Sequence, residues 1–239
     1  TGTNGKTTTC YLIYQMLNLI GIKTAYIGTI GFYIDDMVFK LDNTTPEISL
    51  LYNMLCYAKK RKCKVVVMEV SSHALKQDRI YGLLFDSVLV TNITRDHLDY
   101  HKTLKDYIKS KQKLIYLTRG KKICILNKKD KYYKKFRTKS NNNIIIGKDV
   151  KITLVLMNSS NTYVVVKDTV KRCFILPFMG LFNVYNFLYA YYAIKYLGYN
   201  LNSLKDKYYL LKEPPGRMEK VKYKSNNIFI DYAHTPDAV

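Results

Sequence analysis

The sequence predicts an α/β fold with a mostly parallel sheet, a phosphate-binding loop (P-loop) and a small antiparallel β portion. Segments with apolar residues at helical spacing alternate with short β-branched runs, as they do in a parallel sheet covered by helices. The stretch 2–7, GTNGKT, places glycines and a lysine directly before the first helical segment, as phosphate-binding loops do. Beyond about residue 150 the apolar runs come in close pairs, which is typical of antiparallel hairpins.

In the first half of the chain, helices and strands are expected in turn. The first helical segment stops at Gly21, a residue suited to cap a helix C-terminus. The run KVVVMEV is typical of a strand buried on both faces. The predicted helices are 7–21, 47–62 and 103–117, and the predicted strands lie in 23–34, 64–70, 85–93 and 121–127.

In the second half, hairpin strands are expected at 151–167 and 171–180, followed by a helix at 183–198 that again ends at a glycine. The segment 139–143, KSNNN, is predicted to be a polar loop. A turn-rich joint at 212–219 precedes a new strand and loop within 227–239.

Composition limits the class of protein. The 239 residues suffice for one large domain or one domain plus part of another, and no apolar stretch approaches the roughly 18 residues of a membrane span. Five scattered cysteines suit free thiols in the cytoplasm. The net charge of +21 would suit a nucleic-acid partner. The lysines are spread along the chain, however, so we favour an AT-rich genome as the cause.

Three polar segments are candidates for one site. The P-loop backbone would bind phosphates, Lys6 would reach the terminal phosphates and the Thr7 hydroxyl would hold Mg²⁺. Glu69 ends the apolar run VVVME, at the end of a predicted strand where its carboxylate could hold a metal. Taken alone, Glu69 is more simply interpreted as an ordinary acid at a strand end. TNITRDHLDYH follows the next strand, and its His97 is an unusual Mg²⁺ ligand, since Mg²⁺ prefers oxygen. Three such strand ends meeting at one sheet edge indicate a nucleoside triphosphate site.

The motifs as a set resemble those of the Mur ligases, ATP-dependent ligases of peptidoglycan precursors. TGTNGKTTT, NTTP, MEVSSHALKQDRI, TNITRDHLDYH, YIKSKQKLI, FNVYN, PGRME and DYAHTPDA all appear in the family's order, from residue 1 to the end. SSHALKQDR and DYAHTPD resemble the branch that adds the third amino acid of the stem peptide. The related folate polyglutamate ligases typically have GKGS where this chain has GKTT.

The resemblance implies a division of the chain. Residues 1–216 would form the central ATP-binding domain, without the strand that should precede its P-loop. Residues 217–239 would begin a C-terminal α/β ligase domain, and the family's N-terminal UDP-binding domain would be absent. The chain would therefore be a fragment or a domain of a longer enzyme.

The resemblance also implies roles for residues. Lys6, His97, Lys111 and Arg217 would be catalytic, with Lys111 carried as a carbamate; the alternative for Lys111 is one more solvated lysine on a basic helix. Two Mg²⁺ ions would be held by Thr7, Glu69, His97 and carbamoylated Lys111. ATP would be bound by Gly2, Thr3, Asn4, Gly5, Lys6, Thr7, Thr8, Asn183, Asn186, Arg217 and Asp231. The muramoyl peptide would contact Asn43, Thr44, Thr45, Ser71, Gln77 and Arg79.

The implied function is ATP-dependent addition of an amino acid to UDP-N-acetylmuramoyl-L-alanyl-D-glutamate through an acyl phosphate. We favour meso-diaminopimelate over L-lysine as the amino acid, and expect a cytoplasmic monomer without a membrane span. Another Mur or folylpolyglutamate-type ligase is the alternative. A nucleic-acid-binding P-loop ATPase and a non-catalytic scaffold rank well behind, because no nucleic-acid motif is found and Lys6, Glu69, His97 and Lys111 are intact.

Overall fold

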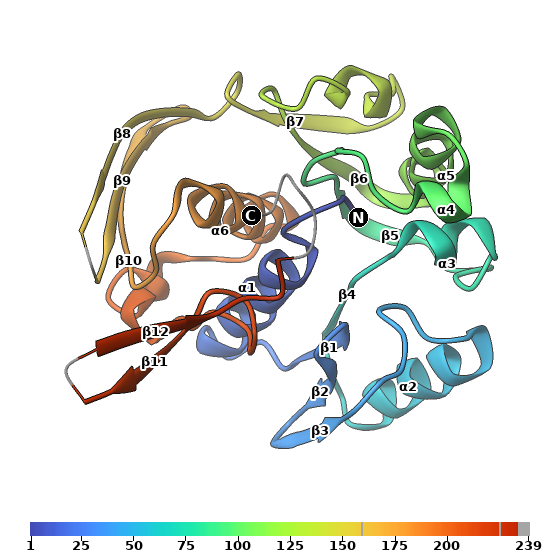
Figure 1. Ribbon diagram of the computed structural model, residues 1–239, viewed down its shortest axis with the longest axis horizontal. Coiled ribbons are helices and arrows are strands. Elements are labelled where there is room, and N and C mark those ends of the chain that lie inside the picture. The colour runs from blue at the N-terminus through green and yellow to red at the C-terminus, as the bar shows by residue number, and fades with distance from the viewer. Residues whose placement is uncertain (159, 225, 234–239) are drawn as a thin grey trace.

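A four-stranded sheet forms from residues 24 to 68 in the computed structural model, which describes residues 1–158, 160–224 and 226–233 (Figure 1). Its order is β3 (Met37–Phe39), β2 (Gly31–Ile34), β1 (Thr24–Gly28) and β4 (Val65–Met68). β1 pairs parallel with β4 and antiparallel with β2. Glycine at position 28 closes the tight turn between β1 and β2, and α2 (Ile48–Lys60) connects β3 to β4.

A second, fully parallel sheet has the order β5 (Phe85–Leu89), β6 (Thr118–Asn127) and β7 (Asn142–Ile146). The prediction of a polar loop over 139–143 is therefore wrong at its end, since residues 142 and 143 begin β7. Three buried isoleucines that follow favour the strand, and the Asn142 side chain donates to the carbonyl of Lys121 at 2.7 Å. The predicted parallel α/β architecture is confirmed, divided between two sheets.

Helices cover these sheets. α1 (Lys6–Leu19) packs against α6 (Leu181–Leu197), which is buried around most of its circumference and lies at the centre of the larger apolar core. α5 (Leu104–Tyr116) belongs to the second apolar core, with α2 and the inner faces of β1 and β5. Among the described residues, five shorter helices lie between the longer elements: α3 (Ser72–Lys76), α4 (Leu98–His101), η1 (Tyr133–Phe136), η2 (Asn202–Leu204) and η3 (Tyr208–Leu210).

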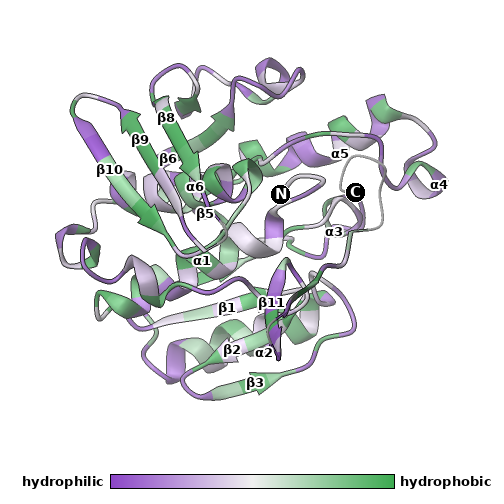
Figure 2. Ribbon diagram, turned by 60° about the vertical axis from the view of Figure 1, so that its left-hand side comes forward, coloured by the Kyte–Doolittle hydropathy of each residue, from purple (hydrophilic) through white to green (hydrophobic). Residues whose placement is uncertain are grey.

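The predicted hairpins form an antiparallel sheet of β10 (Lys171–Leu176), β9 (Thr162–Lys167) and β8 (Lys151–Met157). This sheet covers α6, with the Phe174 and Phe187 rings 5.0 Å apart, and Figure 2 shows the apolar strands of this layer beside α6. β11 (Glu219–Tyr223) and β12 (Asn226–Ile230) form a separate hairpin. The sequence predicted β12 and missed β11, whose lysines conceal the strand pattern. Residues 234–239 of the last predicted loop lie outside the described residues.

β4 and β5 line the two sides of a cavity of about 780 Å³ beneath α1. Among the described strands, β4 pairs only with β1, and β5 only with β6. Val65, Val66 and Met68 are consequently half-buried, so the prediction that KVVVMEV is buried on both faces is wrong for most of this strand. Residues 1–3 run beside the C-terminal end of β5, where Thr91 N donates to Thr1 O at 3.1 Å and Thr3 N donates to Asn92 O at 2.8 Å.

Candidate active site

The glycines of the P-loop allow close packing that side chains would prevent. Gly5 has φ 79° at the N-cap of α1, and a Cβ there would lie 2.3 Å from Asn186 Oδ1. A Cβ on Gly2 would lie 1.9 Å from Thr91 Oγ1. Asn92 Oδ1 accepts from Asn4 N at 2.9 Å, which ties the loop to the end of β5. The N-terminus of a 14-residue helix, preceded by this fixed loop, suits phosphate binding.

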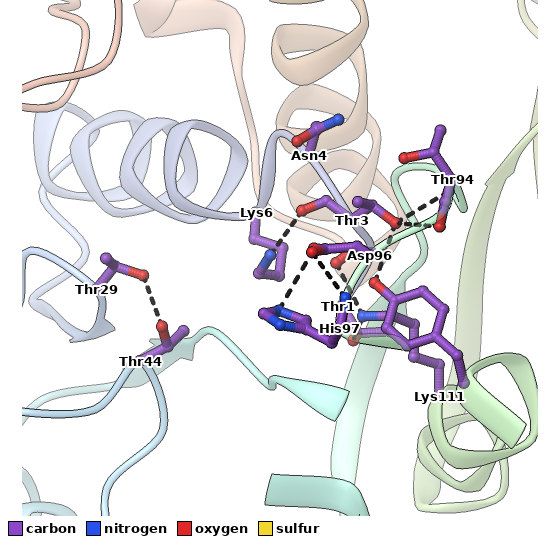
Figure 3. Close-up of polar contacts among 12 residues, drawn as sticks. Thr1, Thr3, Asn4, Lys6, Thr29, Thr44, Thr94, Asp96, His97 and Lys111 are labelled. Atoms are coloured by element: carbon purple, nitrogen blue, oxygen red, sulfur yellow. Dashed lines mark hydrogen bonds and ion pairs between the residues drawn. The ribbon is translucent and has the colours of Figure 1, made fainter. Parts of the chain in front are cut away.

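Lys6 leaves the loop half-buried and facing the site. Its ammonium donates to Thr3 O at 2.8 Å, within the loop itself (Figure 3). Burial lowers the pKa of Lys6, and the charges of Glu69 and Asp96 oppose this shift. The charge of Arg217 lowers the same pKa further. Thr7 and Thr8 are buried in the first turn of the helix.

Four hydrogen-bond donors hold the Glu69 carboxylate at the end of β4, where the residue is only 1% exposed. Its Oε1 accepts from Tyr26 Oη at 2.5 Å and from Thr29 N at 2.9 Å. Its Oε2 accepts from the hydroxyls of Thr7 at 3.0 Å and Thr29 at 3.3 Å. A buried carboxylate needs such partners, and here they include the P-loop threonine predicted to hold Mg²⁺.

Lys111 is 1% exposed, which overturns the alternative of a solvated lysine. It lies on α5, where its Nζ donates to Gly2 O at 2.9 Å and lies 4.5 Å from the centre of the Tyr107 ring. Burial lowers its pKa well below the ordinary value, and the nearby charge of Lys6 adds to this effect while Asp96 opposes it. A lowered pKa favours the neutral amine, which is the nucleophilic form of a lysine side chain.

His97 occupies the left-handed region, with φ 51°, at the start of α4 (Leu98–His101). Its backbone N–H donates to Asp96 Oδ1 at 2.9 Å, and its Nε2 lies 3.4 Å from Asp96 Oδ2. Burial lowers the pKa of His97 and so favours the neutral imidazole, while the charge of Asp96 opposes this shift. Figure 3 shows the two contacts that join Asp96 to His97.

Lys6, His97 and Lys111 border one pocket of about 250 Å³, whereas Thr7 and Glu69 do not line it. It brings together residues from the P-loop, the loop before α2, the start of α3 and the segment after β5. Five of the six predicted substrate residues line it, beside three of the four predicted catalytic residues. The lining residues are Lys6, Asn43, Thr44, Thr45, Ser71, Ser72, His73, Arg79, His97 and Lys111.

Arg79 reaches into this pocket from the segment after α3. Its Nη1 donates to Thr45 O at 3.0 Å, and its Nη2 lies 2.9 Å from Glu47 Oε1. Among the described residues its buried Nε has no hydrogen-bond partner. An arginine fixed this way retains donor capacity for an anionic ligand.

Several other predicted residues do not line the pocket. Gln77 does not line it and donates to Tyr100 Oη at 3.2 Å. Asn183 and Asn186 are buried on α6; Asn186 donates to Asn183 Oδ1 at 3.3 Å and accepts from Thr9 Oγ1 at 3.3 Å. Asp231 Oδ2 accepts from Met218 N at 2.7 Å, beside Arg217 in the hairpin that follows η3.

Several site residues were missed by sequence reasoning. Tyr26 and Thr29 hold Glu69, and Tyr107 Oη lies 3.0 Å from Thr3 Oγ1. Tyr26 resembles any core residue of an apolar strand, so nothing local marks it. The signal for Asp96 and His73 was present, because both stand inside the polar motifs RDHLD and SSHAL.

The residues fit a metal site of mixed ligands. Among the described residues no three His, Cys, Asp or Glu side chains form a ready-made metal site. Mg²⁺ commonly takes one or two carboxylates and completes its shell with phosphates and water. Thr7 Oγ1 and Glu69 Oε2, 3.0 Å apart at a P-loop, provide such a beginning.

The family of the chain follows from its match to known proteins. Residues 1–194 match the Mur ligase middle domain. The chain belongs to the Mur ligase family. It is 38% identical over 252 residues to the UDP-N-acetylmuramoyl-L-alanyl-D-glutamate--2,6-diaminopimelate ligase 1 of Clostridium acetobutylicum, covering all of this chain and 51% of that protein.

Other relatives agree with this assignment. The corresponding ligase of Geobacillus thermodenitrificans is 36% identical over 264 residues, covering all of this chain and 52% of that protein. A solved UDP-N-acetylmuramoyl-L-alanyl-D-glutamate--2,6-diaminopimelate ligase superimposes with a TM-score of 0.86 at 27% identity, over 99% of this chain and 50% of that one. The chain thus spans about half the length of the relatives it matches, and its fold is that of the Mur ligases.

Proposed function

We propose that this chain carries the ATP site of a ligase that adds an amino acid, by preference meso-diaminopimelate, to UDP-N-acetylmuramoyl-L-alanyl-D-glutamate. The observation that carries the proposal is the pocket that groups Lys6 with His97, Lys111 and five of the six predicted substrate residues. The names of the relatives support the same reaction over another Mur or folylpolyglutamate-type ligase.

The chain's own residues suit the phosphoryl transfer that begins this reaction. The P-loop N–H groups and Lys6 bind the phosphates of ATP, and Arg217 adds positive charge from the hairpin. Asn183, Asn186 and Asp231 are proposed to lie on the nucleotide side. Asn43, Thr44, Thr45, Ser71, Gln77 and Arg79 orient the muramoyl peptide so that its D-glutamate carboxylate attacks the γ-phosphate. The resulting acyl phosphate loses phosphate when the amine of the amino acid attacks.

Two Mg²⁺ ions, when bound, neutralise the negative charge of the phosphate oxygens. Thr7 and Glu69 would hold one, and His97 with Lys111 the other. Lys111 becomes an oxygen ligand by carbamoylation, in which its neutral amine adds to CO₂ and releases a proton. Three observations support this: burial, a lowered pKa and a place on the pocket wall.

The wider assignments are proposals of the same kind. Residues 1–216 would be the central ATP-binding domain and 217–239 the beginning of a C-terminal ligase domain. The protein would act in the cytoplasm as a monomer. Among the described residues no helix is long and apolar enough to span a membrane.

Phosphate release by the complete protein in which this chain occurs tests the function. ATP, Mg²⁺ and UDP-N-acetylmuramoyl-L-alanyl-D-glutamate are supplied, with diaminopimelate or L-lysine in separate reactions and Lys111→Ala as the matched variant. We expect release that needs the muramoyl peptide and one amino acid, and that is lost in the variant. ATP hydrolysis that ignores the muramoyl peptide but rises with DNA or RNA would overturn the proposal and favour a nucleic-acid-dependent ATPase.

A further inference from the structure

The two oxygens of Glu69 have different kinds of partner. Oε1 accepts from the Tyr26 phenol at 2.5 Å and from the backbone N–H of Thr29 at 2.9 Å. The backbone N–H of Thr29 has a direction set by the main chain, and the position of the Tyr26 hydroxyl is set by its ring. Among the described residues, Oε2 accepts only from the hydroxyls of Thr7 and Thr29, which can rotate about their C–O bonds and turn their hydrogens elsewhere.

The Tyr26 ring is closely packed. It is fully buried on β1, and its edge or face lies against three other tyrosine rings, those of Tyr11, Tyr14 and Tyr33, at centroid distances of 6.1, 6.3 and 5.6 Å. Rings in such edge-to-face groups are held in one orientation by packing. The phenol hydroxyl is therefore carried to Glu69 by a rigid support.

Gly28 makes the approach of these groups possible. A Cβ at position 28 would lie 2.2 Å from Glu69 Oε1 and 2.3 Å from the Tyr26 hydroxyl. No other residue could stand there without separating the phenol from the carboxylate. β1, Gly28 and Tyr26 together therefore keep the phenol hydroxyl against Oε1 of Glu69.

We propose that Tyr26 is a positioning residue that occupies Oε1 of Glu69 and so leaves only Oε2, beside Thr7, for a cation. A carboxylate restricted to one oxygen suits Mg²⁺, which takes near-ideal octahedral geometry with single-oxygen ligands. Ca²⁺ is larger and commonly takes both oxygens of one carboxylate. Tyr26 would thereby select against Ca²⁺ at the nucleotide site. This inference rests on the proposed ATP and Mg²⁺ site.

The test compares affinities for a non-hydrolysable ATP analogue, measured by calorimetry on the purified protein with Mg²⁺ or with Ca²⁺. Tyr26→Phe removes one oxygen atom and keeps the ring. Tyr33→Phe is the matched control, since it removes a hydroxyl from the same tyrosine group. Loss of an outer-shell partner commonly changes metal affinity about 10–100-fold. We expect the preference for Mg²⁺ over Ca²⁺ to fall about tenfold or more in Tyr26→Phe and to stay at the wild-type value in Tyr33→Phe.

Other outcomes have separate meanings. An unchanged preference in a folded Tyr26→Phe variant, or an equal fall in Tyr33→Phe, would overturn the role of Tyr26. Should circular dichroism find Tyr26→Phe unfolded, Tyr26→Met removes the hydroxyl with a more adaptable side chain and answers the same question. Wild-type protein that binds the analogue equally well with and without divalent cations would instead overturn the proposed metal site itself.

Discussion

The ammonium of Lys111 lies 2.9 Å from the carbonyl oxygen of Gly2, across 109 residues of sequence. The contact joins α5 to the P-loop and places a buried lysine on the wall of the pocket. The positive charge of the P-loop lysine, Lys6, lowers the pKa of Lys111. Burying a lysine in this way is costly, and this supports the proposed role of the Lys111 amine.

Replacing Lys111 by methionine should stabilise the fold in bicarbonate-free buffer. The pKa of Lys111 is lowered in the folded state, so the unfolded chain binds more protons at any pH between that lowered value and 10.5. The cost of burying Lys111 is therefore complete at low pH and disappears as pH rises toward 10.5. We expect Lys111→Met to raise the Tm at pH 7 by about 2–4 °C for each kcal/mol regained. Thermal unfolding by circular dichroism at pH 7 and pH 10 checks this, and a gain that is larger at pH 10 would contradict it.

Gly5→Ala should damage both the loop and nucleotide binding. The new Cβ would meet Asn186 Oδ1 at 2.3 Å, in a backbone conformation that alanine rarely adopts. We expect a loss of about 1–3 kcal/mol in the free energy of unfolding, measured with urea. Gly21→Ala is the matched control, because it has φ 81° but no atom near its Cβ. Equal losses in the two variants would show that backbone strain, not the contact with Asn186, sets the cost.

Arg79→Lys should raise the KM for the muramoyl peptide. The Arg79 guanidinium contacts Thr45 and Glu47, and among the described residues its Nε has no hydrogen-bond partner. A lysine ammonium cannot reproduce this arrangement of donors. Hydrogen bonds to charged groups contribute about 1.5–3 kcal/mol, which corresponds to a rise of about 10–100-fold. Arg61→Lys is the control, since Arg61 pairs with Asp35 away from the pocket. A KM that does not change in Arg79→Lys would remove Arg79 from the substrate site.

Much of the fold was predictable because its signals are local. The apolar spacing of α1 and α6, the glycines that end them and the paired runs of β8 to β10 each follow from short segments. The predictions failed where tertiary context decides. β7 begins with two asparagines whose strand conformation depends on β6, and β11 is rich in lysine.

The site was predictable in its motifs but not in its supports. Lys6, Glu69 and Lys111 stand in motifs, and the structure brings them to one region. Tyr26 could not be found, because a tyrosine in an apolar strand looks like core until its hydroxyl is seen on Glu69. The burial of Lys111 was also hidden, since its helix reads as a basic, exposed one and only the fold places it inside.

We propose that this pocket activates the D-glutamate carboxylate by phosphorylation. Muramoyl peptide with ¹⁸O in that carboxylate, incubated with ATP, Mg²⁺, the amino acid and the complete protein, tests it by mass spectrometry of the released phosphate. An acyl phosphate transfers one carboxylate oxygen to phosphate when the amine displaces it, so the account predicts phosphate carrying one ¹⁸O. Phosphate without ¹⁸O, released at the same rate when the muramoyl peptide is left out, would contradict the account.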